Sequence, residues 1–359
     1  MRADLALLGF GNVGRRFARL LDEQRERLHQ QHDLDCRIVG IATRRHGLAY
    51  NAVGLDGPNA AVFVENGGIV SELSGSQTLP SGATSLDVVR CLSTSEAPLR
   101  VVVETTTLDI AAGQPAIDHV VAALSAGCDV ITANKGPAAF AYQDLRHRAR
   151  EAGLSFLFEG AVMDGVPVFN LTRETMPVVN VLSFRGVVNS TTNHILTALE
   201  DGEDFGPALA RMQIAGIAEA DPTLDVDGWD AAAKAAALAN VLLDARITPH
   251  DVIREGVGPA NATPAREAKA RGMRLRLVAE GARGQTPSVK LRTLPGGDLL
   301  AGLRGTANAL VLTTDLLGEI AICQLGGGLT QTAYALLSDL VTVRRRRAAQ
   351  PGEQLRRSP

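Results

Sequence analysis

Residues 5–14 read LALLGFGNVG, and this stretch decides the fold. Its first four residues form a short apolar run, which is typical of a buried parallel strand. Three glycines follow with the spacing GxGxxG, and apolar residues then recur at near-helical spacing as far as Leu28. A second apolar run covers 36–42. The order of strand, glycine turn, helix and strand predicts a dinucleotide-binding βαβ unit.

The three glycines of this turn are expected to have separate roles. Gly9 permits a sharp turn, Gly11 lets the backbone approach a pyrophosphate, and Gly14 lets the helix pack closely on the strand. The N-terminus of the helix then offers free N–H groups and a partial positive charge to the phosphates. We therefore predict that six residues contact the cofactor: Gly9, Phe10, Gly11, Asn12, Val13 and Gly14.

The end of the second strand bears on the choice between NAD and NADP. An acidic residue there would bind the ribose 2′-hydroxyl of NAD. The chain instead places Thr43, Arg44 and Arg45 at this position. A hydroxyl followed by two arginines favours the 2′-phosphate of NADP(H), and a solvated loop with surface arginines is the alternative.

Two further βα units follow along the chain. Runs of β-branched residues cover 100–103 and 129–132, with a helical stretch between them. Ligands of parallel sheets bind at the carboxyl ends of the strands, so Thr105 and Thr106 are candidate cofactor contacts. Lys135 follows the second run, where it would face both nicotinamide and substrate, and a plain surface charge is the alternative.

Two other stretches carry weaker signals. Residues 51–85 show little periodicity, and we expect irregular connections around short helices there. Residues 159–167 read EGAVMDGVP, a glycine-rich turn that begins with a carboxylate. Such a turn can present several carbonyl oxygens to a hard cation. A plain crossover between domains has the same appearance, and spacing alone favours the crossover.

The middle of the chain holds the densest polar cluster. Residues 189–192 are rich in helix-capping types, which either cap a helix or offer hydroxyls and N–H groups to a small polar substrate. Five carboxylates fall within 219–230, and an alanine-rich helix follows. Asp230 and Lys234 are four residues apart and therefore share a helix face. A surface ion pair is the plain interpretation, but the surrounding alanines argue for burial, where a lysine can move protons.

The composition excludes several classes of protein. The chain has 359 residues, 45% of them apolar and 21% charged, which suits a globular protein of two domains. A net charge of −3 and only nine Phe, three Tyr and one Trp argue against a nucleic-acid binder. No run resembles a membrane span or a secretory signal, and the four scattered cysteines indicate free thiols. We therefore expect a cytoplasmic protein.

Five motifs together resemble the homoserine dehydrogenase family, in the family's order and across most of the chain. They are GFGNVG at 9–14, TANK at 132–135, EGAVMDGVP at 159–167, GVVNSTTNHIL at 186–196 and GIAEADPTLDVDGWDAAAK at 216–234. The last is the most specific. The resemblance implies an α/β fold, with a Rossmann-type dinucleotide-binding domain plus an α+β substrate-binding and dimerisation domain.

The resemblance also implies an activity, the reversible reduction of L-aspartate 4-semialdehyde to L-homoserine with NAD(P)H in threonine, methionine and isoleucine biosynthesis. Lys234 matches the family's proton donor and acceptor, and Lys135 matches a second catalytic lysine. The implied catalytic residues are Lys234, Lys135, Asp230 and Glu219. The implied substrate contacts are Gly216, Glu219, Asp225, Asp230, Ser190 and Thr191.

A sodium site and a homodimer are further implications of the resemblance. The sodium ligands would be Glu159 and the carbonyl oxygens of Val162, Asp164 and Val166, which replaces the crossover favoured by spacing alone. The dimer would form through the sheet of the second domain.

The chain departs from the family at two places. The family usually has glycine where Ser190 stands, and a Gly-x-Gly-Ala-Gly turn where 324–328 read QLGGG. This loop is expected to close on the cofactor, with Gly328 in contact. The departures keep two alternatives open: a related oxidoreductase for another small hydroxy or amino acid, and a non-catalytic NADP-binding regulator.

The expected domains follow from these motifs. A nucleotide-binding domain covers 1–158 and is completed by about 322–343, and the substrate domain covers 159–321. Six arginines lie in 344–359, which we expect to be a disordered basic tail, with nucleic-acid binding by this tail as the weaker alternative. We expect neither the kinase nor the amino-acid-sensing domain that longer relatives carry.

Overall fold

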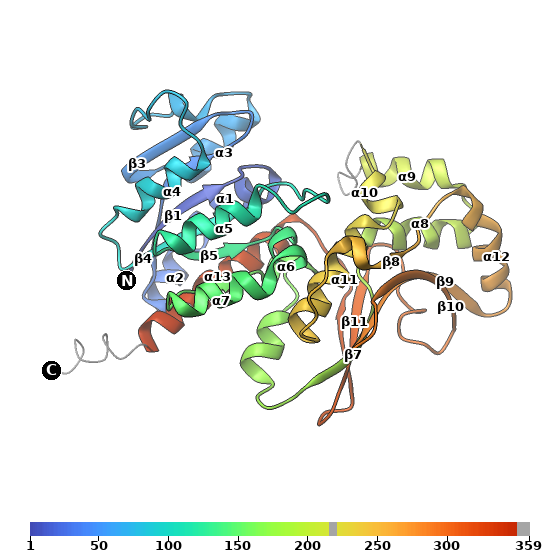
Figure 1. The fold of residues 1–359 in the computed structure, drawn as a ribbon. Helices are drawn as coiled ribbons and strands as arrows, with labels where there is room; N and C mark the ends of the chain where they lie inside the picture. Colours follow the sequence, from blue (N-terminus) through green and yellow to red (C-terminus); the bar gives the residue numbers. More distant parts are fainter. Residues whose placement is uncertain (215–220, 350–359) are drawn as a thin grey trace. The chain divides into compact units, whose positions relative to one another are not determined.

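The computed structural model describes residues 1–214 and 221–349, which form two compact units (Figure 1). The first unit comprises Met1–Pro137, Gln143–Gly165 and the chain from Leu329 onward, and the second comprises Ala138–Tyr142 and Val166–Gly328. The boundaries therefore differ from those expected, because 159–165 belong to the first unit and 322–328 to the second.

A six-stranded sheet organises the first unit, with the order β3-β2-β1-β4-β5-β6. Its strands are β1 (Arg2–Leu8), β2 (Asp35–Ala42), β3 (Leu48–Leu55), β4 (Leu99–Glu104), β5 (Asp129–Thr132) and β6 (Phe156–Leu157). All neighbours are parallel except the edge pair of β2 and β3. Leu5 and Leu7 of the central strand are fully buried, and each contributes about 1.5–3 kcal/mol of stability. The predicted βαβ unit is confirmed.

Helices cover both faces of this sheet, as in doubly wound folds (Figure 1). On one face, Phe17 of α1 (Asn12–Glu23) and Leu336 of α13 (Leu329–Ala349) join Leu5 and Leu7 in a single core. On the other face α4 (Ser85–Ser93) packs so closely on β2 that a Cβ on Gly40 would lie 2.5 Å from a methyl carbon of Val88. The remaining helices are α2 (Arg25–His32), α3 (Gly57–Glu65), α5 (Ala116–Ser125), α6 (Gly136–Phe140) and α7 (Tyr142–Glu151), with single turns at Val70–Glu72 and Glu159–Ala161.

Strand β3 corrects the expectation of irregular structure at the start of 51–85, whereas α3 is one of the short helices expected there. β3 is an edge strand, and Gly54 within it has a φ of +115°. Asn51 sits mid-strand with its side chain buried, accepting a hydrogen bond from the backbone N–H of Val53 at 3.0 Å. These two residues interrupt the alternation of polar and apolar residues that would have revealed the strand.

The C-terminal helix corrects a second expectation. A disordered tail was expected from residue 344, but α13 continues to Ala349. Arg344 is buried and pairs with Asp33 at 3.0 Å, and Arg347 pairs with Asp129 at 2.7 Å. The basic stretch over 344–349 is therefore part of the folded unit, and 350–359 lie outside the described residues.

A second six-stranded sheet organises the other unit, with the order β12-β11-β7-β9-β10-β8. Neighbours are antiparallel except β8 and β10. Its strands are β7 (Val181–Val187), β8 (Ile253–Arg254), β9 (Met273–Ala282), β10 (Ser288–Pro295), β11 (Asn308–Thr314) and β12 (Glu319–Gln324).

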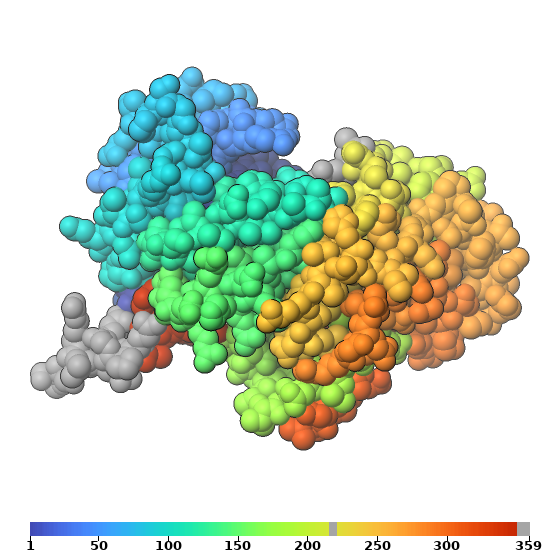
Figure 2. Space-filling model, in the orientation of Figure 1, coloured from blue at the N-terminus to red at the C-terminus, as the bar shows by residue number. Residues whose placement is uncertain are grey.

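The helices of this unit carry most of the predicted substrate residues. They are α8 (Ser190–Glu200), α9 (Phe205–Ile214), α10 (Thr223–Val226), α11 (Trp229–Leu242) and α12 (Ala262–Ala270), with single turns at Leu171–Thr175, Pro249–Asp251 and Pro259–Asn261. In the space-filling view, the part of this unit coloured yellow to orange forms a continuous surface (Figure 2). Among the described residues, no helix is both long and apolar enough to span a bilayer.

Candidate active site

The glycine turn of the first unit has the geometry that a dinucleotide requires. Gly9 has a φ of +89°, and a Cβ there would lie 2.5 Å from the backbone carbon of Thr105. A Cβ on Gly14 would lie 2.8 Å from the carbonyl oxygen of Gly9. Both positions therefore exclude larger residues. A Cβ on Gly11 would meet nothing within 4 Å, so the space beside this residue is open to a ligand.

The first turn of α1 presents its backbone to that space. Gly11 is the N-cap residue and supplies no side-chain cap, so the first N–H groups of the helix remain available to an anion. The side chain of Phe10 is buried in the core, which leaves only its backbone at the turn. Asn12 accepts a hydrogen bond from Arg15 at 2.8 Å. These residues fit the phosphates of a dinucleotide.

The two predicted threonine contacts make hydrogen bonds inside the protein. The Thr105 hydroxyl donates to the carbonyl oxygen of Gly9 at 2.8 Å and so fixes the glycine turn. The backbone N–H of Thr106 donates to the buried carboxylate of Glu104 at 3.0 Å, and its hydroxyl bonds to the same carboxylate. Sequence reasoning missed Glu104, which ends a run of β-branched residues.

The predicted 2′-phosphate residues form the hairpin between β2 and β3. Thr43 closes the hairpin, because its hydroxyl accepts from the N–H of His46 at 2.6 Å and its N–H donates to the carbonyl of Gly47 at 2.9 Å. Arg44 and Arg45 are exposed at the tip. Within the described part of the chain, neither arginine has an ion pair or a hydrogen bond, so both guanidinium groups are available to a phosphate.

Lys135 lies between two residues with fixed backbones. Asn134 is buried, and its N–H donates to the Thr132 hydroxyl at 2.9 Å. The Asn134 side chain accepts from the N–H of Gly136 at 2.8 Å. Lys135 itself is half-buried and follows β5 at its carboxyl end.

The predicted sodium ligands form an irregular loop after β6. Glu159 is buried, and its N–H donates to Asp339 at 2.8 Å. Asp164 has a φ of +50°, and its carboxylate accepts from the hydroxyl of Thr332 at 3.1 Å. No described residue donates to the carbonyl oxygens of Val162 or Asp164, whereas that of Val166 accepts from Val168 at 2.9 Å. Two unengaged carbonyls and a buried carboxylate within one loop are oxygen ligands of the kind that suit a hard monovalent cation.

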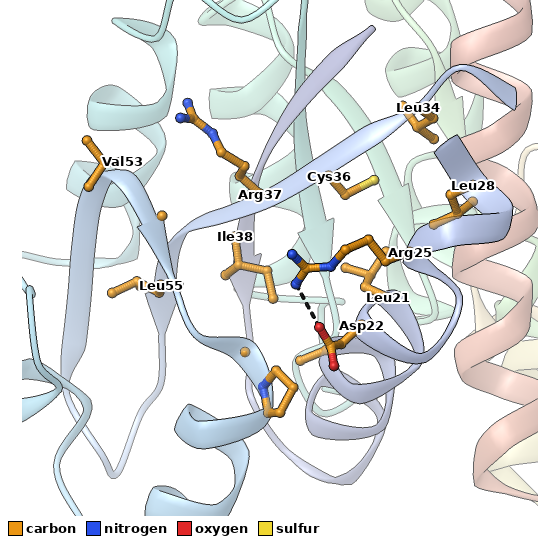
Figure 3. Close-up of a pocket in the computed structure, with 14 residues that line it drawn as sticks. Leu21, Asp22, Arg25, Leu28, Leu34, Cys36, Arg37, Ile38, Val53 and Leu55 are labelled. Carbon is orange, nitrogen blue, oxygen red and sulfur yellow. Dashed lines mark hydrogen bonds and ion pairs between the residues drawn. The ribbon is translucent and has the colours of Figure 1, made fainter. Parts of the chain in front are cut away.

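A cavity of about 300 Å³ lies elsewhere in the first unit, between α1, α2, α3 and the strands β2 and β3 (Figure 3). Its apolar walls include Leu21, Leu28, Leu34, Ile38, Val53 and Leu55. The charged groups at this cavity are paired, Arg25 with Asp22 and Arg37 with Asp4. Burial raises the pKa of Cys36 to about 12, so its thiol stays protonated at neutral pH. Residues of the first half of β2 line this cavity, and the glycine turn does not.

The second unit places two of the predicted catalytic residues, Lys234 and Asp230, side by side. The Lys234 ammonium donates to the carbonyl oxygen of Val188 at 2.7 Å and lies 3.0 Å from the Asp230 carboxylate. Both side chains are largely buried, with 15% and 14% of their surface exposed. Gly228 starts the helix with a φ of +79°, and a Cβ there would lie 2.4 Å from the carbonyl oxygen of Glu255. The helix therefore begins at a fixed position.

Asn189 joins the Asp230 carboxylate to a second carboxylate, that of Asp225. Its side-chain amide donates to Asp225 at 2.8 Å and to Asp230 at 2.9 Å. The Thr191 hydroxyl also donates to Asp225, at 3.0 Å. The pKa of Asp225 is nevertheless raised, first by burial and then by the charge of Asp230. The sequence signal for Asn189 was its capping type, and its amide hydrogen bonds to the two carboxylates were missed.

Ser190 begins α8 and has a partner that sequence reasoning did not find. Its hydroxyl oxygen accepts a hydrogen bond from the amide of Asn308 at 2.9 Å. The other amide atom of Asn308, Oδ1, is buried without a hydrogen-bond partner among the described residues. Asn308 pairs across β11 and β12 with Gln324, the first residue of the loop that departs from the family pattern. Both departures therefore adjoin one residue, Asn308.

The other predicted residues of this region are not all placed. Gly216 and Glu219 lie outside the described residues. Gly328 is exposed at the end of the second unit, directly before α13.

Comparison with known proteins identifies the family. The sequence profile described as "Homoserine dehydrogenase, NAD binding domain" matches residues 9–159, and the profile described as "Homoserine dehydrogenase" matches residues 167–341. The chain belongs to the homoserine dehydrogenase family. The resemblance inferred from the five motifs is thereby confirmed, and with it the fold class.

Individual homoserine dehydrogenases match over nearly the whole chain. An enzyme from Pseudomonas canavaninivorans, named an NAD(+)-dependent homoserine dehydrogenase, is 33% identical over 343 residues, which are 94% of this chain and 95% of that protein. A crystal structure of a putative homoserine dehydrogenase from Archaeoglobus fulgidus superposes with a TM-score of 0.80 at 28% identity, covering 95% of this chain and 99% of that one.

A nucleotide-bound relative also shares the fold. A hyperthermophilic archaeal homoserine dehydrogenase in complex with NADPH superposes with a TM-score of 0.77 at 27% identity, covering 96% of this chain and 98% of that one. Members of this family are NAD(P)-dependent oxidoreductases that act on a CH–OH group. The relatives include both an NAD-named enzyme and an NADPH complex, so family membership establishes a nicotinamide nucleotide without selecting one.

Proposed function

We propose that this chain catalyses the reversible reduction of L-aspartate 4-semialdehyde to L-homoserine, with NADP(H) as the preferred nucleotide. The observation that carries the proposal is the Lys234 ammonium, held between the Val188 carbonyl and the Asp230 carboxylate in a largely buried position. Two acceptors stabilise the protonated form of this lysine. A protonated lysine in a polar site is the acid that aldehyde reduction needs.

Lys234 acts as the proton donor in this scheme. Bound NADPH supplies the hydride for the aldehyde carbon. As negative charge develops on the aldehyde oxygen, Lys234 transfers a proton to it, directly or through a water molecule, and takes the proton back in the oxidation direction. Lys135 stabilises the developing negative charge. Asp230 keeps Lys234 oriented because the two side chains lie one turn apart on α11.

The acidic residues around Lys234 bind the substrate's α-ammonium group. Asp225 and Asp230 form charge-assisted hydrogen bonds to it, and their carboxylates are already held by Asn189. Glu219 and Gly216 join them by family resemblance. Ser190 and Thr191 open α8, so their N–H groups have no partner within the helix and suit the substrate carboxylate.

Arg44 and Arg45 support the preference for NADP(H). Both are exposed at the tip of the hairpin that follows β2, where a dinucleotide's ribose is expected. The hairpin offers no carboxylate to a ribose 2′-hydroxyl. Two guanidinium groups are suited to a 2′-phosphate instead.

A bound sodium ion and a homodimer complete the proposal. Glu159 with the carbonyls of Val162, Asp164 and Val166 would hold the ion and so order the loop after β6. Replacing sodium by potassium in the buffer should lower the melting temperature of the protein if sodium binds at this site.

The homodimer would form through the second sheet, where Leu182 of β7 is 41% exposed. Light scattering, which measures the mass of the particle in solution, tests this.

An assay of NAD(P)H absorbance with the full chain tests the proposed reaction. Homoserine is supplied with NADP⁺ or with NAD⁺, and aspartate semialdehyde with NADPH. We expect homoserine oxidation that is faster with NADP⁺ at low nucleotide concentration. An absence of homoserine oxidation with both nucleotides would overturn the proposal.

A second candidate is a related oxidoreductase for another small hydroxy or amino acid. It rests on Ser190, whose side chain occupies space at the start of α8 and is held there by Asn308. A panel of 3-hydroxy acids and aspartate distinguishes the two candidates, because only the second predicts turnover of a panel member in place of homoserine.

A further inference from the structure

Glu104, which ends β4, is a fully buried carboxylate at the carboxyl edge of the first sheet, with none of its surface exposed. One carboxylate oxygen, Oε1, accepts from the N–H of Thr106 at 3.0 Å and from the Thr106 hydroxyl. The other oxygen, Oε2, is 3.1 Å from the Thr132 hydroxyl at the end of β5. A buried carboxylate is costly unless its oxygens are bonded, so Glu104 ties the ends of two strands together.

The hydrogen bonds continue from Glu104 to both sides of Lys135. The Thr132 hydroxyl accepts from the N–H of Asn134 at 2.9 Å. The Asn134 amide donates to the carbonyl of Thr106 at 3.0 Å, and its oxygen accepts from the N–H of Gly136 at 2.8 Å. The hydrogen bonds of Asn134 therefore lead back to Thr106 and Thr132, the two residues that Glu104 binds.

A histidine ring also lies close to the Glu104 carboxylate. Nδ1 of His119, on α5, is 3.6 Å from Glu104 Oε1, and Nε2 of the same ring is 2.7 Å from the Ser85 hydroxyl on α4. His119 is itself buried. Glu104 therefore lies close to a side chain of α5 as well as to the end of β5.

We propose that Glu104 is a positioning residue for Lys135. Its carboxylate holds Thr106 and Thr132, these hold Asn134, and Asn134 holds the backbone on both sides of Lys135. The proposal rests on the role of Lys135 in the proposed function. Small displacements of a charge-stabilising group have large effects on rate, because its interaction with the transition state depends on both distance and direction.

Two variants of the full chain test this role. Glu104→Gln keeps the shape of the side chain but removes its charge and one acceptor. Thr132→Val keeps the shape and removes the hydroxyl, which bonds to the carboxylate and the backbone carbonyl of Glu104 and accepts from Asn134. We expect kcat to fall by about 100-fold in each, with the KM for homoserine changed much less. The matched control is Asp4→Asn, which removes the charge of another buried carboxylate, near the amino end of the neighbouring strand β1. This variant should have a lower melting temperature and an unchanged kcat.

A second readout follows Lys135 in the protein without nucleotide. The chain has only four lysines, Lys135, Lys234, Lys269 and Lys290, so acetylation rates can be measured for each by peptide mass spectrometry. We expect the Lys135 rate to change in Glu104→Gln and Thr132→Val while the Lys269 rate stays constant. If Glu104→Gln does not fold, Thr132→Val decides alone.

The outcomes separate this proposal from the proposed function. Wild-type kcat and wild-type Lys135 labelling in both variants, with only the melting temperature lowered, would overturn the positioning role and leave the function intact. Wild-type kcat in Lys135→Ala would instead contradict the function assigned to Lys135. In that case the Lys135 labelling rates of Glu104→Gln and Thr132→Val would still show whether Glu104 positions the Lys135 side chain.

Discussion

The Lys234 ammonium lies 3.0 Å from the Asp230 carboxylate, and 85% or more of each side chain is shielded from solvent. An exposed pair at this helical spacing is worth only a few tenths of a kcal/mol. Here the alanines on either side of Lys234 are buried, so the pair is packed into the unit. A shielded pair with a third partner, the Val188 carbonyl, suits proton transfer better than surface stabilisation.

Replacing Lys234 tests the proton-transfer role. Lys234→Ala should lower kcat by about 100- to 10,000-fold, the usual contribution of a general acid or base. Nucleotide affinity should not change, because the glycine turn and the hairpin arginines belong to the first unit. Steady-state kinetics measure kcat, and the fluorescence of NADPH measures binding.

Lys269→Ala is the matched control for this substitution. Lys269 is 41% exposed and pairs with Asp201 on the surface of the same unit. Its loss should leave kcat at the wild-type value. Near-normal turnover of Lys234→Ala would show that another group supplies the proton.

The raised pKa of Asp225 predicts a pH dependence of stability. Burial, followed by the charge of Asp230, raises this pKa from its ordinary value of 3.8. The folded protein therefore binds the Asp225 proton more tightly than the unfolded chain does. The resulting stabilisation is complete below pH 3.8 and is lost as the pH rises through the folded pKa.

Asp225→Asn should remove this contribution. As the pH rises from 4 to 7, wild type should lose stability that the variant does not lose, so the free energy of unfolding of the variant should increase relative to that of wild type. Urea denaturation at a series of pH values measures both free energies. Asp221→Asn serves as the control, because the pKa of Asp221 is lowered by the hydroxyl and N–H of Thr223 and shifts the opposite way. Parallel pH profiles of Asp225→Asn and wild type would refute the burial of a charge at this position.

Local patterns were sufficient for most of the first unit. The strands β1, β4 and β5 are apolar runs buried on both faces, and such runs are recognisable without knowing their partners. The edge strand β3 was missed because Gly54 and the buried Asn51 interrupt its pattern. Arginines 344–347 were misread because their partners are remote: Asp33 lies 311 residues from Arg344, and Asp129 lies 218 residues from Arg347.

The candidate site shows the same limit. Asp230 and Lys234 were found from their spacing, since four residues on a helix always share a face. The contacts of Asn189 with two carboxylates, and of Ser190 with Asn308, join segments that are far apart in the chain. Residue type and spacing carry no information about such pairs, so only the tertiary structure reveals them.

The folded basic stretch predicts unequal roles for neighbouring arginines. Arg344→Ala should lower the free energy of unfolding by about 1 kcal/mol, an amount limited by solvent because Asp33 is 55% exposed. The N-terminal ammonium and then Arg344 lower the pKa of Asp33 to about 2, so this stabilisation exists above pH 3.8 and is lost as the pH falls towards 2. Arg345→Ala is the control, because Arg345 is exposed. Equal melting temperatures for the two variants at pH 7 would contradict the ion pair.

The hairpin arginines predict a change of nucleotide preference. Replacing both Arg44 and Arg45 by alanine should raise the KM for NADPH by at least about tenfold, since a charge-assisted hydrogen bond contributes about 1.5–3 kcal/mol. The KM for NADH should not change, because NADH has no 2′-phosphate. Arg25→Ala, a surface arginine of the same unit, should affect neither value. Equal increases for both nucleotides would mean that the hairpin binds another part of the cofactor.

Ser190 allows steric and hydrogen-bonding effects to be separated. Ser190→Ala keeps the Cβ but removes the acceptor of the Asn308 amide, which should lower stability by about 1 kcal/mol. Ser190→Gly also removes the Cβ, and only this variant opens space at the start of α8.

This space suits a substrate with one extra methylene group, and one methylene changes the discrimination between two substrates by about 1–3 kcal/mol. Ser190→Gly should therefore raise kcat/KM for 2-amino-5-hydroxypentanoate by about tenfold relative to homoserine, and Ser190→Ala should not. Identical substrate profiles for the two variants would show that the Ser190 side chain does not set the size of the pocket.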